Sequence, residues 1–271
     1  MLSRVLNRMR SLVLRTTIAI GLVLASFGRP GAAPVENVFQ LSATDTTIFA
    51  PDSGKIIGHG HYSLTHVDGL DVVEGQNNYL DGEYDQEQQS VRPSSDGRPP
   101  VLVRYRHRFF NANGTLQYED GLDASSGEAD CRRYDNGSDV RDRTLTNIPP
   151  DTYAGATQLM LLVGRLRQGL ASISFHSFNC IPDPHIIAIQ ANLLDSSATL
   201  AKYPGNLIKL EMKPDLGWLN RIVAPFVPKV YGWFDPTDTF NYAGGEFDRY
   251  YKGRHVVMIR TREAGTSLAA H

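Results

Sequence analysis

The sequence predicts a mainly β protein built on an antiparallel sheet, and three observations support this fold class. Short runs of alternating polar and apolar residues recur along the chain after its N-terminal segment. Asp-Gly or Asn-Gly pairs begin at positions 68, 81, 96, 113 and 136, and such pairs tolerate the positive φ angles of tight hairpin turns. The run at 101–110 places Val101, Val103, Tyr105, His107 and Phe109 on one face and Leu102 with three arginines on the other, which is typical of a sheet solvated on one face.

The first 28 residues predict export. Four arginines precede an uncharged, mostly apolar run at 16–28, and the breakers Pro30 and Gly31 follow it. Because this run is shorter than the ~20 residues that a membrane span needs, it favours a removable signal peptide, with an uncleaved N-terminal membrane anchor as the alternative. No Cys follows the run, so lipid attachment there is not supported. We therefore expect a protein of the periplasm or cell envelope.

The composition is that of one ordinary globular domain. Removing the leader leaves about 235 residues, which we assign to a single β domain at 36–262 and a flexible tail at 263–271. Hydrophobic residues make up 41% of the chain and charged residues 21%. The net charge of −2 gives no electrostatic reason to expect a nucleic-acid partner.

Cys131 and Cys180 are the two cysteines of the chain. In an oxidising compartment an even number of thiols favours a disulfide, here closing a loop of about 50 residues and stabilising by about 3–4 kcal/mol in the chain-entropy model. Burial as two separate thiols is the alternative. No histidine pair at ligand spacing accompanies them, so we expect no structural zinc site.

The strands are expected in segments bounded by turn signals, and these segments are 59–67, 70–80, 101–110, 116–123, 124–134, 172–178, 185–194, 206–213 and 254–261. The polar stretch at 84–100 is rich in Pro and Ser and predicts a surface loop or a strand at the sheet edge.

One helix is predicted at 152–168. Asp151 is its expected N-cap after a Pro-Pro pair, and Gly169 is expected to end it. Its apolar residues recur at helical spacing, at Leu159, Leu162, Val163 and Leu166.

The segment 214–236 concentrates large apolar residues and contains both tryptophans. Pro225 and Pro228 forbid one continuous helix, so we expect a short helix ending near Val223 and an irregular apolar continuation. The segment fits a plug or lid over the open side of a curved sheet. The alternative is a patch that faces the membrane interface, which Trp and Tyr favour.

The order of these elements resembles a known architecture. A strand pair at 54–80 (GKIIGHGHYSLTHVDGLDVVEGQNNYL) is followed by further strands, then by a Pro-Pro-Asp-Thr-Tyr insertion, a helix ending at Gly and more strands. Over 45–212 this layout resembles periplasmic families of unknown function with the incomplete, lipocalin-like half-barrel of the lipoprotein carriers LolA and LolB. The resemblance implies a curved antiparallel half-barrel sheet with one or two covering helices around an apolar hollow. It carries over no functional residues.

Catalytic and metal signatures are weak. His59 and His61 share one face of a strand and His66 lies on the other, without a motif that supplies further ligands. No nucleophile elbow is present. Acidic residues gather in two short segments, at Asp81, Glu83, Asp85, Glu87, Asp235 and Asp238. We assign no catalytic residue, metal or cofactor.

These observations predict an exported, non-enzymatic protein that binds a lipid or another apolar ligand in the trough of a half-barrel, with a lipid or membrane surface as its partner. The residues expected to contact the ligand are apolar, from the lid and from the helix: Trp218, Leu219, Ile222, Phe226, Trp233, Leu159 and Leu162. The alternatives are a secreted hydrolase or carbohydrate-active enzyme that uses paired carboxylates, and a structural envelope scaffold with a filled core. The oligomeric state is left open.

Overall fold

The computed structural model describes residues 44–93, 98–135, 138–180, 184–217, 229–239, 241–249 and 255–261, with the backbone alone at 138–141. All of them belong to the second of two compact units, Asn37–His271. The predicted leader at 1–28 and the tail at 263–271 lie outside these ranges. Among the described helices, none has the length and apolar character to cross a membrane.

Within these ranges fifteen strands form one sheet, which one helix covers. The first eight strands are β1 (Thr44–Phe49), β2 (Ile56–Val67), β3 (Leu70–Tyr79), β4 (Tyr84–Arg92), β5 (Val101–Phe110), β6 (Leu116–Asp123), β7 (Glu128–Asp135) and β8 (Ser138–Thr146). The remaining elements are β9 (Thr152–Tyr153), α2 (Ala156–Arg167), β10 (Ser172–Asn179), β11 (His185–Leu200), β12 (Tyr203–Pro214), β13 (Val230–Asp235), β14 (Asn241–Asp248) and β15 (His255–Arg260).

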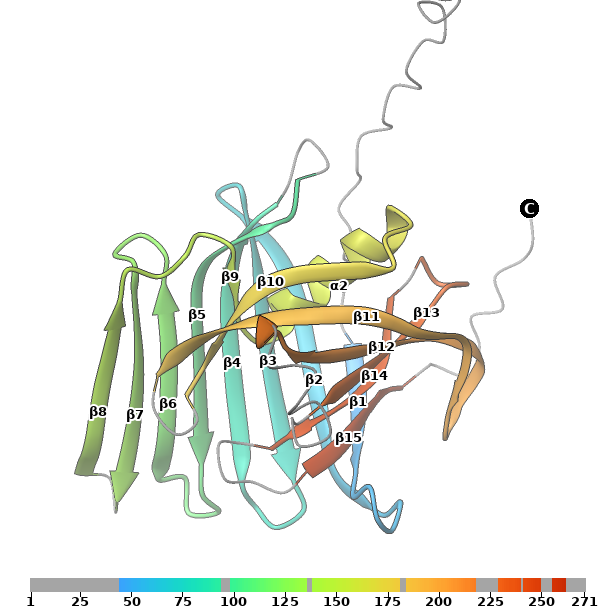
Figure 1. The fold of residues 1–271 in the computed structure, drawn as a ribbon. Coiled ribbons are helices and arrows are strands. Elements are labelled where there is room, and N and C mark those ends of the chain that lie inside the picture. The colour runs from blue at the N-terminus through green and yellow to red at the C-terminus, as the bar shows by residue number, and fades with distance from the viewer. Residues whose placement is uncertain are drawn as a thin grey trace, which may run out of the picture. The chain divides into compact units, whose positions relative to one another are not determined.

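The sheet order is β8-β7-β6-β5-β4-β3-β2-β1-β15-β14-β13-β12-β11-β10-β9. Neighbours pair antiparallel, except that β9 and β10 are parallel. The order starts at β8 and ends at β9, so the sheet is not closed by backbone hydrogen bonds. Figure 1 shows the strands from β8 to β3 as one wall, with β10 and β11 crossing in front of it. The predicted fold class, a curved and unclosed antiparallel sheet, is confirmed.

Each hairpin signal that the structure describes lies between two consecutive strands, but only the first of them forms a two-residue turn. Asp68 and Gly69 both have positive φ angles, of 51° and 77°, and they join β2 to β3 directly. This is the two-residue turn whose backbone twist matches that of the flanking strands. The pairs that begin at 96 and 136 lie outside the described residues.

The main core fills the concave side of the sheet. Helix α2 contacts β4, β10 and β14, so it lies inside the curve of the sheet. It buries Thr157, Met160, Leu161, Leu162, Val163 and Leu166. A second, smaller core cluster contains Phe49, Leu207 and Trp233.

The predicted helix starts too early. Thr152 and Tyr153 pair with β10 as β9, the N-cap is Gly155 and not Asp151, and the helix begins at Ala156. The side chain of Asp151 instead contacts His176, at 2.9 Å. Gly169, with a φ of 74°, follows the helix end as expected.

The polar stretch that begins at 84 is also different from the prediction. Tyr84–Arg92 forms β4, which is an internal strand paired with β3 and β5. The side chains of Asp85 and Gln89 are buried inside the curve, where they make hydrogen bonds. A strand of polar residues is stable inside the sheet because these bonds replace those with water.

The second half of the segment 214–236, where the structure describes it, is not the expected irregular chain. Val230–Asp235 forms β13, so Trp233 lies on a regular strand and not in an irregular lid. Residues 218–228, which include most of the predicted lid, lie outside the described ranges.

Candidate functional site

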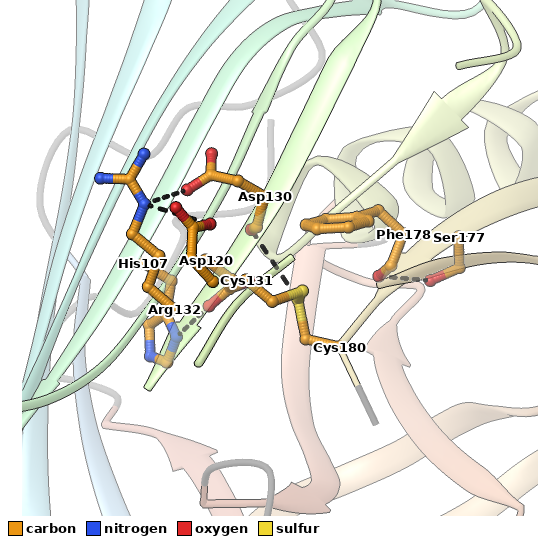
Figure 2. Close-up of a disulfide and its surroundings, with 9 residues drawn as sticks. His107, Asp120, Asp130, Cys131, Arg132, Ser177, Phe178 and Cys180 are labelled. Carbon is orange, nitrogen blue, oxygen red and sulfur yellow. Dashed lines mark hydrogen bonds and ion pairs between the residues drawn. A yellow bond between two sulfur atoms is a disulfide. The ribbon is translucent and has the colours of Figure 1, made fainter. Parts of the chain in front are cut away.

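A disulfide joins the two ends of the curved sheet. Cys131 lies on β7, the second strand from one end, and Cys180 directly follows β10, the second strand from the other. Their Cα atoms are 5.9 Å apart, and the predicted bridge is confirmed. Figure 2 shows Phe178 beside Cys180, and the rings of Phe178 and Tyr105 meet edge to face at 6.5 Å. The disulfide and this aromatic contact hold the sheet ends together where backbone pairing does not.

The predicted ligand contacts fall on two faces of the sheet. Leu162 is fully buried in the main core, and Leu159 packs against that core while partly exposed. Trp233 is 4% exposed and belongs to the second cluster, whereas its neighbour Phe234 belongs to the main core. Successive strand residues point to opposite faces, so Trp233 does not line the same hollow as Leu162. Trp218, Leu219, Ile222 and Phe226 lie outside the described residues.

A polar cluster lies within the concave face, and its members were not predicted to meet. His107 of β5 contacts Asp120 of β6 through Nδ1 at 3.0 Å, and its Nε2 lies 3.9 Å from Asp85 of β4. Figure 2 shows His107 and Asp120 on the wall that also carries Cys131. The His107 side chain is 15% exposed. Burial lowers its pKa, but the hydrogen bond and charge of Asp120, with the charges of Asp85 and Glu87, raise the pKa of His107 to about 9.

The neighbouring carboxylate Asp85 is held by neutral donors. Tyr79 donates its hydroxyl hydrogen to Asp85 at 2.8 Å, and Asn77 donates at 2.9 Å. Burial raises the pKa of Asp85, and it also raises the pKa of Glu87. The cluster therefore combines a readily protonated imidazole with carboxyl groups whose ionisation is costly.

Two side chains of β4 cap the start of α2. The backbone N–H of Ala156 donates to Glu87 at 2.8 Å, and that of Thr157 donates to Gln89 at 2.9 Å. Gln89 also donates to Glu87. The first N–H groups of a helix have no partner within the helix, so β4 replaces a local capping residue. This fixes α2 against the wall of the sheet.

The acidic residues considered for catalysis already have partners within the chain. Arg249, after β14, forms a bidentate pair with Asp81 at 2.8 and 2.9 Å and also binds Glu83 at 2.6 Å. Asp235 accepts from Tyr203 at 3.0 Å. Asp238 binds Arg260 at 2.5 Å. These carboxylates connect segments that are distant in sequence.

The strand histidines have the predicted orientation. His59 and His61 are exposed, and His61 contacts Asp45 at 2.8 Å. His66 contacts Asp71 at 2.9 Å. Across the described part of the chain, no three His, Cys, Asp or Glu side chains are arranged to hold a metal ion.

Among the comparisons with known proteins, solved structures supply the matches. No protein-family model matches the chain, and no curated protein matches it. Among solved structures, it is similar to a β-barrel-like protein of a domain of unknown function, DUF1849, from Brucella abortus. The two share 11% sequence identity with a TM-score of 0.44, over 82% of this chain and 94% of the other. Nothing in this match is specific to LolA or LolB.

Proposed function

We propose that this is an exported protein of the cell envelope that binds a lipid or another apolar ligand on the concave side of its half-barrel, without catalysis. The observation that carries the proposal is the unclosed sheet with an apolar concave face covered by a single described helix. The disulfide supports export, because such bonds persist in oxidising compartments.

Helix α2 is the element that a ligand would displace. It presents a row of apolar side chains to the sheet, and its polar attachment to β4 is confined to its first turn. A ligand that replaced these contacts would gain about 25 cal/mol for each Å² of apolar surface buried. It would need little polar recognition, which suits an acyl chain.

Mass spectrometry of lipids that co-purify from the native host tests this proposal. We expect a stoichiometric lipid, and we expect the delipidated protein to bind added fatty acid. Leu159→Asn should lower lipid recovery about tenfold, because it puts an unpaired amide against the ligand. Leu170→Asn is the control, since Leu170 is 41% exposed beyond the helix end. Absence of both a co-purified lipid and fatty-acid binding would refute the proposal.

An envelope scaffold with a filled core is the second candidate, and one observation favours it. Leu162 and Val163 of α2 are fully buried among side chains of the sheet, so the chain itself occupies this part of the hollow. A lipid-free protein in the same assay would support this candidate. The enzyme alternative has less support, since Asp81, Glu83 and Asp238 already form ion pairs.

A further inference from the structure

A polar trough crosses the outer face of the sheet, opposite the concave core. Its volume is about 790 Å³, and its lining comes mainly from β2 to β7. Strand pairing aligns one row across the six strands, formed by Ser63, Glu74, Gln88, Arg106, Gly121 and Asp130. Five inter-strand steps of about 4.8 Å make this row about 24 Å long. The trough therefore has the shape of a site for an extended molecule.

The row is interrupted at Gly121, which contributes no side chain between Arg106 and Asp130. A Cβ atom there would lie 3.1 Å from Asp130 Oδ1. Asp130 Oδ2 is buried and accepts no hydrogen bond from the described residues, although it lies 3.1 Å from Arg132 in an ion pair. The side chain of Asp130 is 25% exposed as a whole, so Oδ1 is the oxygen that a ligand can reach.

The three arginines that line the trough are already compensated. Arg104 donates to Asp123 at 2.9 Å, and Arg108 donates to Glu119 at 2.7 Å. Arg106 lies 3.7 Å from Glu119 and is 45% exposed, so its guanidinium N–H groups are accessible to a ligand. Four outward-facing acids also line the trough, namely Glu74, Asp123, Glu128 and Asp130. The trough thus offers many donors and acceptors without a strong charge of either sign.

We propose that this trough binds a neutral oligosaccharide that lies across the strands. A sugar hydroxyl both donates and accepts, so it can bind next to amide, carboxylate and guanidinium groups in turn. Gln88, Arg106 and Asp130 supply one of each within the central row. Because Gly121 has no side chain, the carboxylate of Asp130 lies against the strand here.

Two other ligand classes fit the trough less well. A polyanion gains affinity by neutralising its charge with cations, and here the arginines face acids of their own chain. An extended peptide binds by adding a strand to a sheet edge, with pockets for its side chains. The strands beneath the trough are paired on both sides, so they present no edge.

Isothermal titration of the purified, oxidised full-length protein tests the proposal. The probes are maltohexaose, cellohexaose and chitohexaose, with a heparin hexasaccharide as the polyanion and a polar hexapeptide as the peptide. We expect binding of at least one neutral hexasaccharide. Gly121→Val introduces a residue that strands favour and displaces the carboxylate of Asp130, whose Oδ1 would lie 3.1 Å from the new Cβ atom. Arg106→Ala removes the accessible guanidinium. Each should weaken binding about tenfold.

Arg92→Ala is the matched control, because Arg92 is an exposed arginine of β4 that does not line the trough. It should bind the sugar as the unchanged protein does. The proposal is overturned if no neutral hexasaccharide binds, if only heparin or the peptide binds, or if Gly121→Val binds as tightly as Arg92→Ala. Circular dichroism of each variant confirms that it is folded.

Discussion

At the scale of single residues, His107 links the charge of the concave core to its stability. It lies between two carboxylates, Asp120 at 3.0 Å and Asp85 at 3.9 Å, on a face that is otherwise largely apolar. An imidazolium inside the sheet is tolerated because these carboxylates compensate its charge. The residue therefore stabilises the fold mainly when it is protonated.

Replacing His107 should remove a pH-dependent contribution to stability. A folded-state pKa of about 9 exceeds the ordinary value of 6.5, so the contribution is complete below pH 6.5 and is lost as the pH rises through 9. The shift corresponds to about 3 kcal/mol. We expect His107→Gln to lower the free energy of unfolding by up to that amount at about pH 6, and by much less at about pH 10, in urea titrations.

His59→Gln is the control for this measurement, because His59 is exposed on the outer face of β2. It should leave the free energy of unfolding nearly unchanged at both pH values. An equal loss for His107→Gln at the two pH values would show that the imidazole acts only by packing.

The sequence contained a signal for this cluster, because His107 falls on the apolar face of the strand predicted at 101–110. Its partners were not predictable, because Asp120 and Asp85 come from β6 and β4, and the latter was not expected to be internal. Register between strands depends on the whole sheet. Residue identity showed where a charge would be buried but not what would compensate it.

At the scale of elements, the alternation of polar and apolar residues predicted correctly which side chains of β5 are buried over most of the strand. A bulge reverses the pattern near its first residues. Tyr105 and Phe109 are buried and Arg106 is exposed, as expected. Val101 is 38% exposed, whereas Leu102 is 2% exposed, which reverses the prediction at this end. The pairing with β4 shifts between Ser90 and Val91. A bulge of this kind exchanges the faces of a strand, and the local sequence did not reveal it.

The start of α2 is capped by Glu87 and Gln89 of β4, a strand distant in sequence. Gly155 makes this contact possible because it has no side chain. Its φ is 49°, and a Cβ atom would collide with the carboxylate of Glu87. We expect Gly155→Ala to destabilise the protein by about 2–3 kcal/mol, from backbone strain and from loss of the helix cap. Urea unfolding measures the change.

Gly169→Ala separates the two causes. Gly169 also has a positive φ, of 74°, but nothing lies within 4 Å of its Cβ position. This variant should cost only about 1 kcal/mol, the strain of the backbone conformation itself. Equal losses for the two variants would mean that the contact between Glu87 and the helix start contributes little.

At the scale of the whole molecule, the fold is a long sheet whose ends meet without pairing. Turn residues and alternation predicted the strands, and the two thiols predicted the bridge. The order of the strands in the sheet was not predictable in the same way. The pairing of β1 with β15, for example, joins the first and the last described strands of the chain. Long-range pairing of this kind leaves little local signal.

The disulfide should therefore stabilise the ends of the sheet more than its middle. Cys131 and Cys180 are 49 residues apart in sequence, which corresponds to about 4 kcal/mol in the chain-entropy model. We expect Cys131→Ser with Cys180→Ser to lower the free energy of unfolding by about that amount. Because the bridge lies one strand from each end, amide hydrogen exchange should accelerate most in β7, β8, β9 and β10 and least in β1, β2 and β15. Acceleration spread evenly over the sheet would instead indicate that the bridge acts only on the unfolded chain, and that the aromatic contact between Tyr105 and Phe178 is enough to hold the ends together.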